Sequence, residues 1–190
     1  MRKTAWSDLI EQLEQKGVTF DTGLTDAEIA EAESNYAVSF PEDLRGFIQT
    51  AIPNRFPFPN WRSAGDPFIK EMLRLPLEGI LFDVENNEFW LPEWGTKPRG
   101  KEEAKLIVEE RVRLAPRLVP IYRHRMMPDR PITAENPVLS VHQTDVIYYG
   151  FDLDDYFRHE FGLEGRKEWP NKVREIEFWD VERWQDLRWR

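Results

Sequence analysis

Apolar residues recur at helical spacing through the first fifty positions of the chain and predict three helices. The first covers Thr4–Lys16 and ends at Gly17, because glycine readily takes the left-handed conformation that closes many helices. The second begins at Thr25, which forms a capping box with Glu28 three residues later. The third follows Phe40-Pro41, since proline suits a helix start, where its missing N–H costs no hydrogen bond.

Helical spacing returns in the second half of the chain. A helix is predicted over Glu102–Ala115, where Pro116 ends it. Another covers Asp152–Phe161, with Asp152 as its polar cap and Gly162 as its stop. Near the C-terminus one or two last helical turns are predicted from the spacing of Val181, Trp184 and Leu187.

Strands are predicted where short runs of β-branched and aromatic residues lie between turn residues. The segment Pro137–Gly150 has two such runs around the polar group His142-Gln143-Thr144-Asp145, which indicates a strand pair or a bent strand. We also predict a hairpin from Gly79–Val84 and Phe89–Leu91, joined by a turn at residues 85–88. Further strands are expected at Leu118–Tyr122 and Ile176–Trp179, and residues 52–68 are expected to form a loop.

This order of elements determines the predicted fold class. Helices and strands are segregated along the chain, and the strands have short hairpin connections. We therefore expect an α+β fold in which a mainly antiparallel sheet packs against helices. A length of 190 residues favours a single domain over residues 1–190.

The distribution of charge narrows the classes of partner. The net charge is −9, and residues 1–50 hold ten acidic and four basic side chains. Nucleic acid would require a concentrated positive surface, so we predict no nucleic-acid partner. An acidic N-terminal surface suits a basic protein partner, although a solvated surface that only aids solubility is an equal alternative.

The composition also bears on the compartment. The chain has no cysteine, which excludes disulfides and cysteine-based metal sites. It has no apolar run near the roughly 20 residues that a membrane span needs, and its N-terminus lacks the apolar core of a signal peptide. We expect a cytoplasmic protein with no membrane partner.

Four segments together resemble the SUKH superfamily, which is named partly after fungal cell-wall assembly regulators. In residues 24–48, LTDAEIAEAESNYAVSFPEDLRGFI is similar to the start of that family, in which a capped acidic helix precedes a Phe-Pro or Leu-Pro dipeptide that opens the next helix. The matching positions are Thr25, Ile29, Glu33, Phe40, Pro41, Leu44 and Phe47. The later segments FWLPEWGTKP, APRLVPIYRHRMMP and NPVLSVHQTDVIYYGFDLDDYF resemble later blocks of bacterial members.

The sharpest points of this resemblance are Trp94-Gly95 and Tyr149-Gly150, and it covers roughly residues 20–180. One departure is that the family often has Asn-Gly-Gly after the Phe-Pro helix, where this chain has residues 51–55, AIPNR. The resemblance implies an α+β fold with an antiparallel sheet. It also implies a binding role, because many bacterial members are thought to be immunity proteins that block polymorphic toxins and fungal members are described as regulatory scaffolds.

Several residues have side chains that could bind a metal or take part in catalysis, and each of them also has a structural interpretation. His142 and Asp145 can approach across a turn, but two ligands do not make a metal site, and a hydrogen-bonded turn is the favoured interpretation. Ser140 lies two residues before His142, which is the spacing of a possible nucleophile and base on one strand face. No glycine-rich oxyanion loop accompanies them, so a catalytic pair is not the favoured interpretation. Glu33 is expected to hydrogen-bond the next loop.

Two further groups of residues leave alternatives open. Asp83, Glu88 and Glu93 lie near two tryptophans, which is the best case for a carbohydrate-acting or carbohydrate-binding protein. Arg123-His124-Arg125 has the chemistry of an anion clamp, but pairing of the arginines with surface carboxylates is the favoured interpretation.

We therefore predict that this chain is a non-catalytic binding protein that needs no cofactor or metal. Its most favoured role is that of an immunity protein that binds and neutralises a basic toxin domain, and the alternatives are a regulatory scaffold or a carbohydrate-binding protein. Aromatic and polar residues at strand ends and loops, together with acidic residues at helix starts, are the candidate contacts. They are Trp90, Glu93, Trp94, His142, Gln143 and Asp145, with support from Asp26, Glu28, Glu42 and Asp43.

Overall fold

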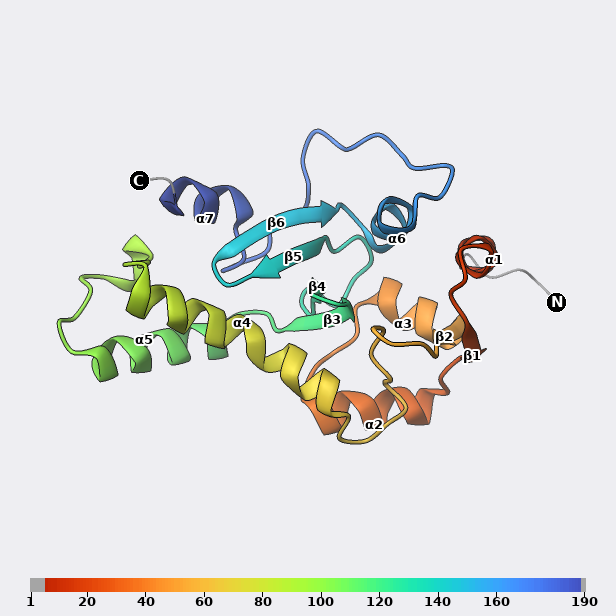
Figure 1. The fold of residues 1–190 in the computed structure, drawn as a ribbon, viewed down its shortest axis with the longest axis horizontal. Helices are drawn as coiled ribbons and strands as arrows, with labels where there is room; N and C mark the ends of the chain where they lie inside the picture. Colours follow the sequence, from red (N-terminus) through yellow and green to blue (C-terminus); the bar gives the residue numbers. More distant parts are fainter. Residues whose placement is uncertain (1–5, 189–190) are drawn as a thin grey trace.

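The computed structural model describes residues 6–188, with side chains through Trp184. Its helices are α1 (Ser7–Gln15), α2 (Asp26–Tyr36), α3 (Glu42–Thr50), α4 (Pro67–Asn86), α5 (Lys101–Leu114), α6 (Leu153–Phe161) and α7 (Val181–Arg188), with a 3-10 turn at Pro92–Trp94 (Figure 1). Its strands are β1 (Phe20–Thr22), β2 (Ala51–Pro53), β3 (Leu118–Tyr122), β4 (Arg125–Pro128), β5 (Val138–His142) and β6 (Asp145–Gly150). The α+β fold class predicted from the sequence is confirmed.

The three N-terminal helices form as their capping residues predict. The Thr25 Oγ1 atom accepts a hydrogen bond from the Glu28 N–H at 3.2 Å, and Glu28 Oε2 accepts one from the Thr25 N–H at 2.8 Å. Glu33 accepts a hydrogen bond from the Phe40 N–H at 2.8 Å, so its expected contact with the next loop is confirmed. The predicted start of α1 at Thr4 lies outside the described residues.

A four-stranded antiparallel sheet in the order β3-β4-β5-β6 forms the centre of the fold. The predicted strand pair in Pro137–Gly150 is confirmed, and His142 pairs with Asp145 at its turn. The β3–β4 and β5–β6 turns each contain one residue with positive φ, Arg123 at 52° and Gln143 at 55°. A separate two-stranded sheet joins β1 to β2, which the sequence did not predict.

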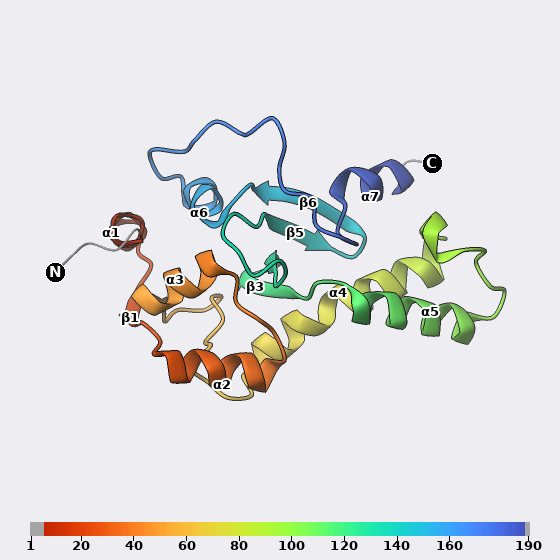
Figure 2. The same ribbon diagram turned by 180° about the vertical axis from the view of Figure 1, so that it is seen from behind.

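The sheet separates two hydrophobic cores because its side chains alternate between faces. On one face, Val119, Ile121 and Met127 pack with α1, α2, α3 and α6 in what we call the first core. On the other face, Met126 and Leu139 pack with α4, α5 and α7 in the second core. Figures 1 and 2 show α4 beside α5, with α4 extending from α2 towards the β5–β6 turn.

The predicted hairpin at residues 79–91 is wrong, because Gly79–Val84 forms the last turns of α4. Asp66 caps this helix by accepting hydrogen bonds from two backbone N–H groups, and Pro67 occupies its first turn. A short apolar run looks alike in a buried helix and in a buried strand, so only its longer context can decide. That context contained a helical stripe of buried residues, at Ile69, Met72, Pro76, Ile80, Asp83 and Val84.

The predicted strand at Ile176–Trp179 is also wrong, since this segment has no regular structure. Ile176 and Trp179 lie in the second core, and the indole N–H of Trp179 donates to the Pro116 carbonyl at 2.7 Å. The predicted last helix is confirmed as α7, although the Leu187 side chain lies outside the described side chains. Over residues 6–188, we find no helix whose length and hydrophobicity would allow it to cross a membrane.

Candidate partner-binding surface

The ten candidate contact residues fall into two groups that lie apart. Asp26, Glu28, Glu42 and Asp43 stand in the first turns of α2 and α3. The other six lie around the second core, three in the segment that follows α4 and three at the β5–β6 turn. Figure 1 shows α2 and α3 in one half of the molecule and the segment after α4 and the β5–β6 turn in the other half, so the fold does not bring the two groups into one surface.

The β5–β6 turn is held against α4. The buried carboxylate of Asp83 accepts hydrogen bonds from the Thr144 N–H at 2.9 Å and from the Thr144 hydroxyl at 2.5 Å. A Cβ atom on Gly79 would lie 2.6 Å from the Gln143 Cα atom, so a glycine is needed there. His142 is exposed and Gln143 is half-buried, so this contact leaves part of the turn at the surface.

Among the aromatic candidates, the prediction that Trp94 acts as a surface anchor is wrong. Its side chain is 6% exposed within the second core, which leaves a partner almost no surface to contact. Trp90 is half-buried, its ring lies edge-on to Trp94 at a centroid distance of 5.2 Å, and its N–H donates to the Gly95 carbonyl at 2.7 Å. Glu93 pairs with Arg183 of α7 at 2.5 Å.

These contacts also bear on the carbohydrate alternative. Two of its three carboxylates are committed within the fold: Asp83 is buried under the β5–β6 turn, and Glu93 pairs with Arg183 of α7, while Glu88 is exposed. Asp83 therefore joins α4 to the β5–β6 turn, and Glu93 joins the segment after α4 to α7.

Two residues of the acidic group have structural roles. The backbone hydrogen bond from Thr25, followed by the contact with Arg62, lowers the pKa of Glu28 to about 2. Glu28 and Arg62 are 2.7 Å apart, and Arg62 also donates to the Thr22 carbonyl at 2.8 Å. Asp43 accepts a hydrogen bond from the Glu135 N–H at 2.6 Å, and burial raises the pKa of its carboxyl group.

The remaining carboxylates of residues 6–50 are largely at the surface. The side chain of Asp26 is 88% exposed, and Glu42 is also exposed. Among the cations of this part of the chain, Lys16 is exposed, while Arg45 is half-buried and lies 3.3 Å from Glu33. We call the exposed carboxylates of this part of the chain the acidic surface, which consists of Asp8, Glu11, Glu14, Asp21, Asp26, Glu31 and Glu42.

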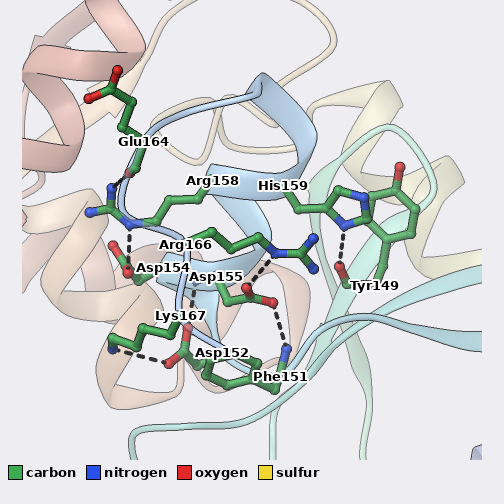
Figure 3. Close-up of polar contacts among 10 residues, drawn as sticks. All are labelled: Tyr149, Phe151, Asp152, Asp154, Asp155, Arg158, His159, Glu164, Arg166 and Lys167. Atoms are coloured by element: carbon green, nitrogen blue, oxygen red, sulfur yellow. Dashed lines mark hydrogen bonds and ion pairs between the residues drawn. The ribbon is translucent and has the colours of Figure 1, made fainter. Parts of the chain in front are cut away.

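A polar network around α6 fixes the irregular segment that follows it (Figure 3). Asp155 is fully buried and accepts hydrogen bonds from Arg166 at 2.8 Å and from the Phe151 N–H at 3.3 Å. Asp152 accepts the Asp155 N–H at 2.7 Å, which confirms its predicted capping role, and lies 3.9 Å from Lys167. The sequence predicted the cap but not the ionic contacts that Arg166 and Lys167 make with α6 and its cap, because both residues lie in a stretch without periodicity.

The arginine of the predicted anion clamp that the fold holds most firmly is Arg125. It lies 3.4 Å from Glu160, its guanidinium is 3.6 Å from the centroid of the Tyr149 ring, and it donates to the Ser140 hydroxyl at 2.8 Å. Arg125 is therefore paired with a carboxylate as predicted, but the pair is largely buried, with side chains 13% and 15% exposed, and does not lie at the surface. Ser140 accepts a hydrogen bond from an arginine rather than facing a base, and burial followed by the charge of Arg125 lowers the pKa of His124.

The comparisons with known proteins add no relative. No family model matches this chain, no curated protein matches its sequence, and no solved structure matches its fold. In the described part of the chain, no group of three or more histidine, aspartate or glutamate side chains is arranged to hold a metal ion.

Proposed function

We propose that this protein is a binding protein of the immunity type, which neutralises a toxin by forming a complex with its basic domain. The observation that carries the proposal is the acidic surface. Within residues 6–50, seven exposed carboxylates stand against one exposed lysine, Lys16, and Arg62 from outside this range contacts Glu28. The resemblance of residues 20–180 to the SUKH superfamily supports the same role. The binding is non-catalytic in this proposal and needs no cofactor.

The physical argument concerns association. A surface with an excess of one charge attracts an oppositely charged partner over a distance set by the ionic strength, and so raises the rate of encounter. Such steering acts on the association rate more than on the final affinity. The exposed carboxylates are suited to it because they face solvent: the Asp26 side chain is 88% exposed even though it lies 3.8 Å from Arg45.

The first experiment identifies the partner. A tagged copy of the protein is used to capture complexes from the native host, and mass spectrometry identifies what co-purifies in near-equal amounts. A large secreted protein bound through a basic C-terminal toxin domain is the expected result. Recovery of cell-envelope enzymes would favour the regulatory scaffold instead, and binding of glycans without a protein partner would favour the carbohydrate alternative.

The second experiment tests the acidic surface with a matched control. The variant Glu14→Lys with Glu31→Lys alters the acidic surface, and Glu103→Lys with Glu110→Lys makes the same charge change at exposed positions of α5. We expect stopped-flow association with the captured partner to slow about tenfold in the first variant and less than about twofold in the second. Equal slowing in both, or a wild-type rate that does not fall with added salt, would contradict the steering mechanism.

A further inference from the structure

A groove of about 500 Å³ lies where the C-terminal end of α5 meets the middle of α4. Its apolar lining comes from both helices and from the segments that follow α5 and precede α7, and includes Leu73, Leu77, Val112, Pro116 and Trp179. The position of Trp179 in this lining is fixed, since its indole belongs to the second core and its N–H donates to the Pro116 carbonyl. This size lies in the range of roughly 300–1,000 Å³ that is typical of small-molecule sites.

The polar part of the lining is rich in positive charge. Four cationic side chains line the groove, Lys70 and Arg74 from α4 and Arg113 and Arg117 from the end of α5 and the residues after it. Among the described residues that line it, Glu109 is the one carboxylate. This local excess of cations occurs in a chain whose net charge is −9.

Two of these four cations are already occupied within the fold. Arg74 lies 3.0 Å from Glu78, and Arg117 donates to the carbonyls of Tyr36 and Ala37 at 2.9 and 2.8 Å. Within the part of the chain that the structure describes, Lys70 and Arg113 have no carboxylate at ion-pair distance, and both are exposed. An anion placed in the groove would give these two side chains a charged partner beside an apolar wall.

We propose that this groove binds a small amphiphilic organic anion. Its apolar body lies against Leu73, Leu77 and Val112, and its carboxylate, sulfonate or phosphate group lies between Lys70 and Arg113. Apolar contact supplies most of the binding free energy, and the two cations select the sign of the charge. This site is independent of the proposed toxin partner, because the acidic surface belongs to other residues.

Decanoate is the probe for the first test, measured by isothermal titration calorimetry below its micelle concentration and at low salt. We expect saturable binding of one molecule per chain. The matched cation decyltrimethylammonium, which has the same apolar tail, should bind at least about tenfold more weakly, because the groove repels its charge. Absence of saturable heat with decanoate, or equal binding of the two probes, would overturn the proposal.

Variants then locate the site. Lys70→Gln with Arg113→Gln should weaken decanoate binding about tenfold, and Lys16→Gln with Arg111→Gln, which removes the same charge outside the groove, should change it less than about twofold. Leu77→Gln should weaken binding by a similar factor through the apolar lining, with its thermal melt recorded beside it. All the cations changed are exposed, so these variants keep the test valid even if Leu77→Gln unfolds the protein. Equal weakening in the paired charge variants would show that the anion binds elsewhere.

Discussion

The carboxylate of Asp83 fastens the β5–β6 turn to α4, and its removal gives a direct test of how this end of the fold is held. The side chain of Asp83 is 5% exposed, as is that of Thr144, whose N–H and hydroxyl both donate to Asp83 Oδ2. The other carboxylate oxygen accepts a hydrogen bond from the Asn87 side chain at 2.5 Å. All three donors lose their acceptor in the variant Asp83→Ala.

The magnitude follows from the two donors of Thr144. A buried donor left without an acceptor costs about 1–3 kcal/mol, and the hydroxyl can rotate to recover part of that loss. We therefore expect Asp83→Ala to lower the free energy of unfolding by about 3 kcal/mol. Asp83→Asn keeps one oxygen that can face Thr144, so it should lower this free energy by only about 1 kcal/mol.

The assay is urea unfolding followed by far-ultraviolet circular dichroism, with linear extrapolation to water. Glu85→Ala is the control, because Glu85 is an exposed carboxylate on the same helix and should change stability by no more than about 0.5 kcal/mol. A double-mutant cycle with Thr144→Ala should give a coupling energy above about 1 kcal/mol. A loss below about 1 kcal/mol in Asp83→Ala, or equal losses in its alanine and asparagine variants, would refute the reasoning.

Three further predictions concern single side chains. Gly150→Ala should lower the free energy of unfolding by about 2 kcal/mol or more in the same urea assay, because the new Cβ would lie 2.6–2.8 Å from three atoms of Tyr156; an unchanged midpoint would show that α6 can shift without cost. Trp94→Ala should lower the free energy of unfolding by about 3–5 kcal/mol because it leaves a cavity in the core. Trp90→Ala, at a half-buried position, should lower it clearly less, and the reverse order would contradict the burial of the two rings. The pKa of Glu28 is lowered in the folded protein, so its contribution to stability is present above pH 4.5 and is lost as the pH falls towards 2. Glu28→Gln should therefore flatten the fall in unfolding free energy between pH 5 and pH 3. Parallel curves of unfolding free energy against pH for the wild type and the variant would refute this linkage.

Local signals allowed the sequence to predict many of the elements. The cap at Thr25, the proline before α3 and the polar turn after His142 act on neighbours within a few residues, and all of them appear in the structure. Prediction failed at Gly79–Val84, where Pro76 and Gly79 interrupt the sequence of a long helix and an apolar run of six residues suits either structure. Pairing between distant segments, as in β1 with β2, leaves no local trace.

The candidate contact residues show the same limit. The sequence indicated Trp94 and Glu93 as aromatic and acidic residues of a loop. Their surroundings depend on the C-terminal part of the chain, where Phe178 stacks on Trp94 and Arg183 of α7 pairs with Glu93. Sequence reasoning also placed Asp26 and Trp90 in one surface, although α4 carries the second core away from α2 (Figure 1). The sequence did not predict the groove beside α5, because its lining residues come from four separate segments.

The sequence by itself determined the fold class, the acidic charge of the N-terminal helices and the caps of α2 and α6, because each depends on composition or on contacts between near neighbours. Only the tertiary structure decided which carboxylates remain at the surface. Asp83 is buried against a donor from a distant segment, Asp155 is buried against Arg166 of the segment after α6, and Asp26 is left in solvent. A charged side chain is buried only where the fold supplies its hydrogen-bond partners, and those partners are fixed by packing across the whole chain.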